Sequence, residues 1–205
     1  MAKLLYVKAS PRGERSFSIR AADAFVASYK NANPDDTVEE LDLFNADIPE
    51  FDAAAAEGKY AIIYGKDGSE ASKAAWKKVV EVIDYFKGFD KYVLAVPMWN
   101  FGLPYKLKLY LDTIIQPTHT FAVNEDGSYA GLVTGKKALS VYSSGGAYEG
   151  DMAGLDHQRP HLEFLLGFMG IEDRRQLAVA GTLGPGGHEA LKKACAEAEK
   201  LAKEF

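Results

Sequence analysis

The chain has 205 residues, a length that suits one domain with one large core, and a mildly acidic formal net charge of −5. That charge argues against nucleic acid as a partner, because proteins that bind nucleic acids usually carry a basic excess or a basic stripe. No apolar run reaches the roughly 18 residues of a membrane span, the N-terminus lacks the features of a signal peptide, and one cysteine cannot form an intrachain disulfide, so we expect a cytoplasmic protein without a membrane partner.

Strand-like and helix-like segments then alternate along the chain. The segment Ser69–Phe86 is strongly amphipathic, with Ser69 as its expected N-cap and Gly88 as its stop. In chain order the pattern predicts strand Lys3–Ala9, helix Phe17–Lys30, edge strand Thr37–Asp42, a helix around Ala53–Tyr64, helix Ser69–Phe86, strand Lys91–Val96, helix Tyr105–Ile115, a hairpin excursion Thr120–Leu132, strand Lys137–Tyr142, helix Asp156–Met169, strand Arg175–Ala180 and helix Glu189–Lys203.

Five strands that alternate with helices predict an α/β fold of three layers, in which a parallel sheet is covered by helices on both faces. Right-handed crossovers favour the flavodoxin-like strand order 2-1-3-4-5 at this length, with the small hairpin excursion before the fourth strand. No repeat and no linker interrupts the chain, so we expect residues 1–205 to form a single domain.

The loop after the first strand is rich in hydroxyl groups and ends at a helix N-terminus. Ser10, Ser16 and Ser18 can donate hydrogen bonds, and Arg12 and Arg15 lie within reach. Free N–H groups and the helix dipole favour an anion there. The loop matches neither a dinucleotide fingerprint nor a Walker loop, and it suits a single phosphate monoester. The alternative is that one serine caps the helix and the others are ordinary loop residues.

The loop after the third strand runs from Pro97 to Pro104 and contains Met98, Trp99, Asn100 and Phe101. An apolar cluster in a loop usually marks a docking place or packs into a core or subunit interface. Aromatic faces together with the Asn100 amide would suit a flat ligand with polar edges.

The loop after the fourth strand contains Ser143, Ser144, Gly145, Gly146 and Tyr148. Paired glycines allow the backbone to approach a ligand closely, although a tight turn would explain them equally well. In open parallel sheets ligands bind beyond the carboxyl ends of the strands, so the three loops belong together. FMN requires three such loops. One holds its phosphate, one stacks on its ring and one forms hydrogen bonds with the edge of the ring.

With these residues the sequence resembles the FMN-dependent NADH:azoreductases, also called NAD(P)H:quinone oxidoreductases of flavodoxin-like fold. The resemblance covers nearly the whole chain and is carried by Ser10 with Ser16–Ser18, by Pro97–Phe101, by Gly131–Lys137 and by Ser143–Gly146. It implies an FMN-binding domain, NADH or NADPH as electron donor, quinone or azo acceptors and a homodimer with a flavin site at each end of its interface.

The resemblance also implies the role of each loop. Residues of the first loop would hold the phosphate, Pro97–Phe101 would line the isoalloxazine, and the glycine loop would complete the ring site, which gives as cofactor residues Ser10, Ser16, Phe17, Ser18, Pro97, Met98, Trp99, Asn100, Phe101, Ser143, Ser144, Gly145 and Gly146. The family often has Tyr in place of Trp99 and Arg in place of Ser144. We expect these departures to affect nicotinamide preference and substrate range.

The flavin carries the hydride chemistry, so no catalytic side chain is expected and none is seen. The substrate pocket is expected to include Trp99, His119, Phe121 and Tyr148, with His119 either a proton donor at the pocket edge or a plain loop residue. His157 and His161 have helical spacing, but Gln158 and Pro160 break the zinc pattern, so no metal site is predicted.

Three functions fit these patterns. The first is a two-electron reductase in which NAD(P)H reduces FMN, and FMN then reduces a quinone or an azo compound by a ping-pong scheme. The second is a flavodoxin-type electron carrier without NAD(P)H turnover of its own. The third is a phosphate-binding regulatory module without flavin. The long excursion between Gln116 and Thr134 is further expected to reach a second subunit and roof its pocket.

Overall fold

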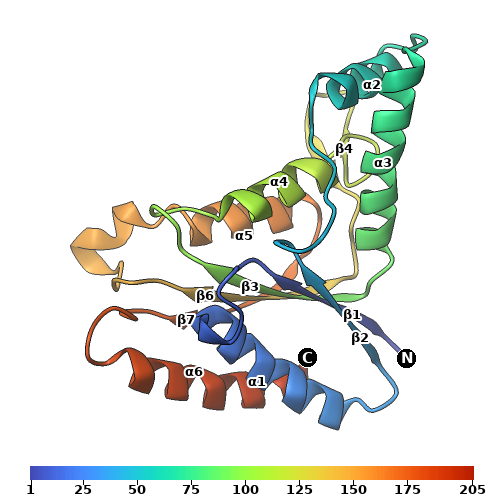
Figure 1. Ribbon diagram of the computed structural model, residues 1–205. Helices are drawn as coiled ribbons and strands as arrows, with labels where there is room; N and C mark the ends of the chain where they lie inside the picture. The colour runs from blue at the N-terminus through green and yellow to red at the C-terminus, as the bar shows by residue number, and fades with distance from the viewer.

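The computed structural model describes residues 1–205 and is built on one parallel sheet of five strands in the order β2-β1-β3-β6-β7 (Figure 1). Its strands are β1 (Lys3–Lys8), β2 (Thr37–Asp42), β3 (Lys91–Pro97), β6 (Lys137–Ser143) and β7 (Asp173–Val179). Counted among the sheet strands alone, this is the order 2-1-3-4-5, so the expected flavodoxin-like topology is confirmed.

The register of the parallel strands places their carboxyl ends at one edge of the sheet. Lys8 of β1 lies opposite Asp42 of β2 and Ala95 of β3, and Pro97 of β3 lies opposite Ser143 of β6. The loops that leave these strands are therefore neighbours, as ligand binding at such an edge requires.

Helices cover both faces of the sheet, with α1 and α6 on one side and α3, α4 and α5 on the other (Figure 1). The helices are α1 (Phe17–Ala32), α2 (Ala53–Ile63), α3 (Glu70–Lys87), α4 (Tyr105–Ile114), α5 (Arg159–Phe168) and α6 (Gly187–Leu201), with short 3-10 turns η1 (Gly13–Arg15), η2 (Gly150–Leu155) and η3 (Ala202–Glu204). A core of 25 buried residues lies on the α3–α5 side and a core of 19 on the α1–α6 side, so both faces of every central strand are apolar. No helix is both long and apolar enough to span a bilayer.

The ends of α3 follow from local chemistry. The Ser69 hydroxyl accepts a hydrogen bond from the backbone N–H of Ser72 at 3.2 Å, and the helix stops at Gly88, as predicted. Trp76, Val79 and Ile83 form part of its buried stripe. Hydrogen-bonded helix ends and one apolar face are local features, which is why the sequence predicts this helix well.

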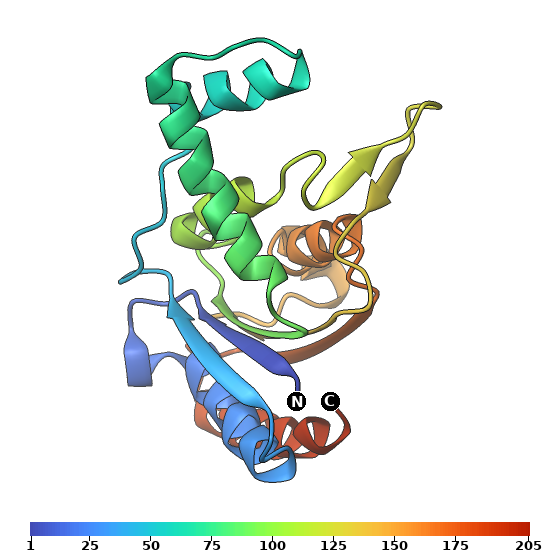
Figure 2. The same ribbon diagram turned by 90° about the vertical axis from the view of Figure 1, so that its right-hand side faces the viewer.

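The helices α2 and the first half of α3 form an arm, defined here as residues 53–78, that stands away from the rest of the molecule (Figures 1 and 2). The two helices pack closely because α2 has Gly58 at the contact. A Cβ atom there would lie 2.5 Å from the Ser72 carbonyl oxygen. The arm is thus a helical hairpin held by its own contacts.

A two-stranded hairpin of β4 (Phe121–Val123) and β5 (Tyr129–Gly131) projects beside α5 (Figure 2). The predicted hairpin excursion before the fourth sheet strand is therefore confirmed. Its base is fixed by two glycines, because a Cβ atom on Gly131 would lie 2.3 Å from the Gly170 nitrogen. Gly170 also has a φ of +100°, which a side chain would strain.

The predicted start of α5 at Asp156 was wrong by three residues. The Asp156 carboxylate accepts hydrogen bonds from the N–H groups of Gln158 at 2.9 Å and Arg159 at 3.0 Å, so it satisfies free donors at the helix start from outside the helix. The Gln158 amide donates to the Val96 carbonyl at 2.9 Å, which anchors this helix start to the end of β3.

Candidate active site

The loop between β1 and α1 presents buried hydroxyls at a helix N-terminus. Ser16 occupies the N-cap position, yet its side chain caps no backbone N–H of α1. Its hydroxyl instead lies 3.1 Å from that of Ser18, and both side chains are at least 98 % buried, with exposures of 2 % and 0 %. The reading of these serines as an ordinary helix cap is therefore not supported by their hydrogen bonds.

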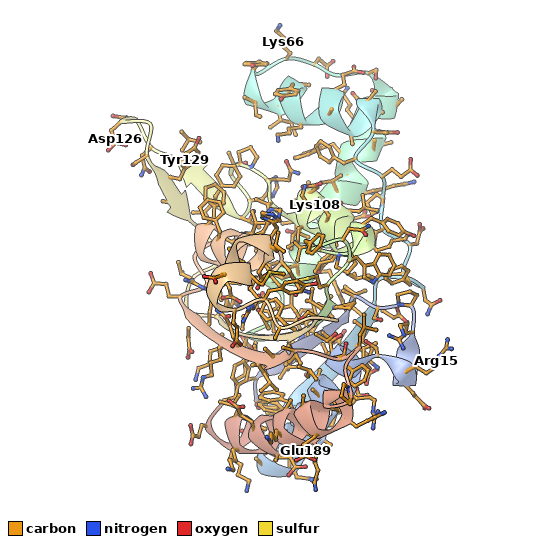
Figure 3. All side chains as sticks on the ribbon, turned by 90° about the vertical axis from the view of Figure 1, so that its left-hand side faces the viewer. Arg15, Lys66, Lys108, Asp126, Tyr129 and Glu189 are labelled. Carbon is orange, nitrogen blue, oxygen red and sulfur yellow. The ribbon has the colours of Figure 1, made fainter.

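The other residues of this loop take different positions. Ser10 is buried and its hydroxyl accepts a hydrogen bond from the Arg12 N–H at 3.4 Å. Phe17 is the first residue of α1, and its ring packs against the His188 ring with centroids 5.9 Å apart. Arg15 lies at the outer edge of the loop, in solvent (Figure 3). The loop thus offers buried hydroxyls and N–H groups within, and arginines only at its rim.

The loop after β3 is held by main-chain hydrogen bonds. The Met98 N–H donates to the Ser143 carbonyl at 2.7 Å, which ties this loop to the end of β6. Trp99 and Gly102 exchange two backbone hydrogen bonds of 3.0 and 2.9 Å. The two residues between them, Asn100 and Phe101, have positive φ values of 46° and 66°. Asn tolerates this conformation, whereas Phe is rarely found in it, and such strain concentrates at functional sites.

Aromatic rings flank this turn on two sides. Trp99 is half-buried and its ring centroid lies 5.8 Å from that of Phe44 and 6.1 Å from that of Tyr105. Phe101 is 43 % exposed and makes an edge contact with Tyr148 at 5.7 Å. The segment is therefore neither a free surface nor a core, but a partly open aromatic site.

The sequence reasoning missed Phe44 and Tyr105. Phe44 follows β2, whose end lies at the same sheet edge, and that position was the available signal. Its backbone N–H donates to the Asp42 carboxylate at 3.0 Å, which orients the turn that carries its ring. Tyr105 opens α4 and is 62 % exposed, so its ring belongs to the site rather than to the core.

The glycines of the loop after β6 lie against side chains of neighbouring loops and do not have left-handed backbone angles. Neither Gly145 nor Gly146 has a positive φ. A Cβ atom on Gly145 would lie 2.8 Å from the Leu183 side chain, and one on Gly146 would lie 3.2 Å from the Tyr148 ring. A turn that requires positive φ therefore does not explain the pair, and the nearest groups are the ends of the Leu183 and Tyr148 side chains.

Loop residues after β7 also hold the glycine loop, although no sequence motif predicted them. Thr182 donates to the Ser144 carbonyl through its N–H at 3.1 Å and its hydroxyl at 3.0 Å, and the Leu183 N–H donates to the Gly145 carbonyl at 3.2 Å. The Ser144 hydroxyl donates to the Gly146 carbonyl at 2.8 Å. With its carbonyls so occupied, the loop is preorganised.

His119 and Phe121 are not brought to Trp99 within one chain. Both follow the C-terminal end of α4, whereas Trp99 precedes its N-terminal end. The His119 ring packs on Trp76 of α3 with centroids 6.0 Å apart, and burial followed by the nearby Lys87 cation lowers the pKa of this imidazole. The placement of His119 and Phe121 at a substrate pocket therefore stays a prediction, tied to the expected contact of this excursion with a second subunit.

The histidine pair on the expected helix also requires a correction. His157 lies before α5, whose first residue is Arg159, and its N–H donates to the Phe101 carbonyl at 3.0 Å. His157 and His161 therefore do not share a helix face, and the geometric premise for a paired metal ligand is lost. No group of three or more His, Cys, Asp or Glu residues could hold a metal ion.

Comparison with known proteins agrees with this geometry. A family model described as flavodoxin-like fold matches residues 2–202. The chain is similar to an FMN-dependent NADH:quinone oxidoreductase of Nitratidesulfovibrio vulgaris, with 47 % identity over 100 % of both chains. It is also similar to the protein of that name from Desulfotalea psychrophila, with 40 % identity over 100 % of this chain and 98 % of the other.

Solved structures give the same assignment. An azoreductase from Bacillus anthracis str. Sterne superimposes with a TM-score of 0.92 and 31 % identity, and each chain is covered completely. An FMN-dependent NADH-azoreductase from Bacillus anthracis str. Ames Ancestor, solved in complex with FMN, has a TM-score of 0.89 and 29 % identity over 100 % of this chain and 99 % of that one. The chain therefore belongs to the family of FMN-dependent NADH:quinone oxidoreductases of flavodoxin-like fold.

Proposed function

We propose that the protein is an FMN-dependent oxidoreductase that uses NADH to reduce quinones and azo compounds. The observation that carries this proposal is the set of three loops at one sheet edge, which combine buried hydroxyls, an aromatic turn and a glycine loop. The relatives named above bear this activity in their names, and one related structure contains FMN.

The first loop fits the phosphate of FMN. The hydroxyls of Ser16 and Ser18 face each other at 3.1 Å and no side chain caps α1, so a phosphate would gain both hydroxyls and the free N–H groups of the first turn. Hydrogen bonds to a charged acceptor are stronger than those between neutral groups. Ser10 would complete the set from the other side of the loop.

The second and third loops fit the isoalloxazine ring. The Asn100 amide and the backbone N–H groups of the glycine loop would serve the polar edge, while Trp99 and Phe101 would supply apolar faces. The absence of side chains at Gly145 and Gly146 would let the ring approach the backbone of this loop. We assign Pro97, Met98 and Ser143 to the same site because they link the two loops.

Bound FMN would supply the redox chemistry between NADH and the acceptor, a transfer of two electrons together with protons. The protein needs no nucleophile of its own for this. Its residues bind and orient the cofactor, keep the loops rigid and shape the space beside Trp99 and Tyr148 in which donor and acceptor alternate. No observation favours an electron carrier without NADH turnover.

We propose a homodimer in which each chain roofs the pocket of the other. An aromatic patch lies on the hairpin and α5, with Phe121, Tyr129, Phe164 and Phe168 in mutual ring contacts of 4.7 to 6.0 Å. Tyr129 is 63 % and Phe164 66 % exposed, although large apolar patches are uncommon on monomers. The patch and its hairpin support the prediction that Gln116–Thr134 contacts a second subunit and brings His119 and Phe121 to its pocket.

We also propose that residues 1–205 form one FMN-binding domain, since both hydrophobic cores share one sheet. A cytoplasmic location is proposed on cysteine content alone, because Cys195 has no intrachain partner for a disulfide.

The test is direct. Protein reconstituted with flavin should retain one FMN per chain, release FMN rather than FAD on denaturation, and oxidise NADH when a quinone or an azo dye is added. Retention of FMN without NADH turnover would leave the electron carrier as the correct assignment, and no flavin binding at all would leave the phosphate-binding module.

A further inference from the structure

One short segment at the start of α5, residues 156–159, contacts the main chain of two aromatic residues of the candidate site. The His157 N–H donates to the Phe101 carbonyl at 3.0 Å. The Arg159 guanidinium donates to the Tyr148 carbonyl at 3.3 Å. Because the rings of Phe101 and Tyr148 meet edge to face at 5.7 Å, this segment holds the backbone on both sides of that ring contact.

Tyr148 has its only main-chain hydrogen bond to this segment. Its carbonyl accepts from Arg159, whereas its N–H donates to no group of the chain. The next residues, Glu149 and Gly150, are exposed, so burial does not fix the main chain there. The Tyr148 ring lies against Gly146, at which a Cβ atom would be 3.2 Å from it. A small shift of the Tyr148 backbone would therefore move the ring along the edge of the glycine loop.

Arg159 is held in turn by a buried carboxylate. The Asp156 side chain is 5 % exposed and forms an ion pair with the Arg159 guanidinium. Its other oxygen accepts hydrogen bonds of 2.9 and 3.0 Å from N–H groups at the start of α5. A buried charge is tolerated where it is paired and hydrogen-bonded, and the guanidinium has donors for a second acceptor besides the carboxylate. Asp156 therefore fixes the guanidinium, and the guanidinium fixes Tyr148.

An ordinary ion pair at a helix start does not account for these contacts. Capping of α5 requires only the Asp156 carboxylate, whichever side chain follows at position 159. Exposed ion pairs contribute little, whereas Arg159 belongs to a pair with a buried carboxylate and gives a further donor to a carbonyl eleven residues earlier in the chain. That additional hydrogen bond indicates a role at the loop that carries Tyr148.

We propose that Asp156 and Arg159 are positioning residues for the reaction, which hold Tyr148 against Phe101 and so set the spacing of these two rings at the proposed pocket. Neither charged side chain touches the reacting atoms in this role. Positioning of this kind has a large effect, because a displacement of roughly 1 Å at a reaction centre can lower a rate about 100-fold. The inference rests on the proposed function and identifies residues that shape its site.

Steady-state kinetics of the FMN-loaded protein test this role. Arg159→Met keeps an unbranched side chain and removes the guanidinium, so kcat/KM for a small quinone should fall about 10- to 100-fold while the FMN dissociation constant changes less than about threefold. Asp156→Asn still accepts the two N–H groups through its amide oxygen but no longer pairs with a cation, so it should reproduce the loss. The double variant should lose no more than either single variant, because both changes release the same guanidinium. Arg175→Met is the matched control and should behave as the wild type, because Arg175 is 27 % exposed, lies 3.7 Å from Asp173 and donates to the Glu204 carbonyl at 3.1 Å, near the opposite edge of the sheet.

A second background separates positioning from a general loss of stability. In Tyr148→Ala the ring is already absent, so the addition of Arg159→Met should change kcat/KM less than about twofold. General destabilisation would lower kcat/KM equally in both backgrounds, and that result overturns the proposal. An unchanged kcat/KM in Arg159→Met overturns it as well.

Fluorine NMR of protein labelled with 3-fluorotyrosine follows the ring itself and does not depend on turnover. The Tyr148 resonance, identified by its loss in Tyr148→Phe, should move toward the position of free fluorotyrosine in Arg159→Met and should not move in Arg175→Met. A resonance that moves in neither variant overturns the proposal. Wild-type protein that oxidises no NADH in the presence of a quinone would refute the proposed function and with it the role in the reaction, while the NMR result still decides whether Arg159 holds the ring.

Discussion

The hydroxyl pair of Ser16 and Ser18 makes the sharpest prediction about cofactor binding. Without a bound phosphate the two hydroxyls are buried and serve as each other's partner at 3.1 Å. Removal of one therefore leaves the other unsatisfied, which costs about 1–3 kcal/mol of unfolding free energy. Removal of both hydroxyls leaves no buried hydroxyl without a hydrogen-bond partner, so the double variant should be nearly as stable as the wild type.

For FMN binding, the double variant should be more impaired than either single variant. Hydrogen bonds to a charged group contribute about 1.5–3 kcal/mol each, so each single substitution by Ala should raise the FMN dissociation constant about 10- to 100-fold and the double substitution should raise it further. The effects of the two substitutions on apoprotein stability should thus be non-additive, whereas their effects on FMN affinity should add. A helix-capping role would produce neither pattern, since no capping hydrogen bond is present.

The assay combines urea unfolding of apoprotein with titration of FMN fluorescence for Ser16→Ala, Ser18→Ala and the double variant. Ser28→Ala is the matched control, because Ser28 lies on the same helix and its hydroxyl donates to the Glu199 carbonyl at 3.1 Å, on an exposed surface. It should leave FMN affinity unchanged. A double variant that binds FMN within twofold of the wild type would refute the phosphate assignment.

Four further predictions follow from other sites. Trp99→Tyr should change the ratio of kcat/KM for a bulky azo dye to that for a small quinone, with FMN affinity and Tm nearly fixed. A uniform loss with a lower Tm would instead mean that the contacts with Phe44 and Tyr105 serve packing. Double-reciprocal plots of NADH oxidation at several quinone levels should be parallel, because donor and acceptor use one pocket in turn, and intersecting lines would contradict this. Gly131→Ala should lower Tm and displace the hairpin, since its Cβ atom would lie 2.3 Å from the Gly170 nitrogen, whereas Gly127→Ala at the hairpin turn, where nothing lies within 4 Å, is the control for positive-φ strain alone. Finally, hydrogen bonds from Tyr29 and from the Ala2 N–H, with the Lys91 cation nearby, lower the pKa of Asp36 below its ordinary 3.8, so its contribution to stability is complete above that value and lost as the pH falls through the lowered pKa. Asp36→Asn should therefore flatten the fall of Tm in acid, and an unchanged acid profile would exclude Asp36 as a cause.

Much of the fold was determined by the sequence alone, because its causes are local. Ser69 and Gly88 delimit α3 through capping groups within a few residues, and the turn residues near Gly127 produce the hairpin. The strand order also followed, since right-handed crossovers leave few alternatives for five strands that alternate with helices. The start of α5 failed because a carboxylate outside the helix, on Asp156, supplies its hydrogen bonds.

Only the tertiary structure decided which residues meet. Phe44 reaches Trp99 because β2 and β3 end at the same edge, although more than fifty positions separate the two rings in the chain. Leu183 lies against Gly145 because the neighbouring strands β6 and β7 end side by side. His119 lies beside Trp76 because α4 carries the chain away from the edge at which it began. Sequence patterns encode periodicity and caps within a few residues, whereas contacts between distant segments depend on how the elements pack. For the same reason the exposed arm became visible only when α2 proved to have an apolar surface that its own chain does not cover.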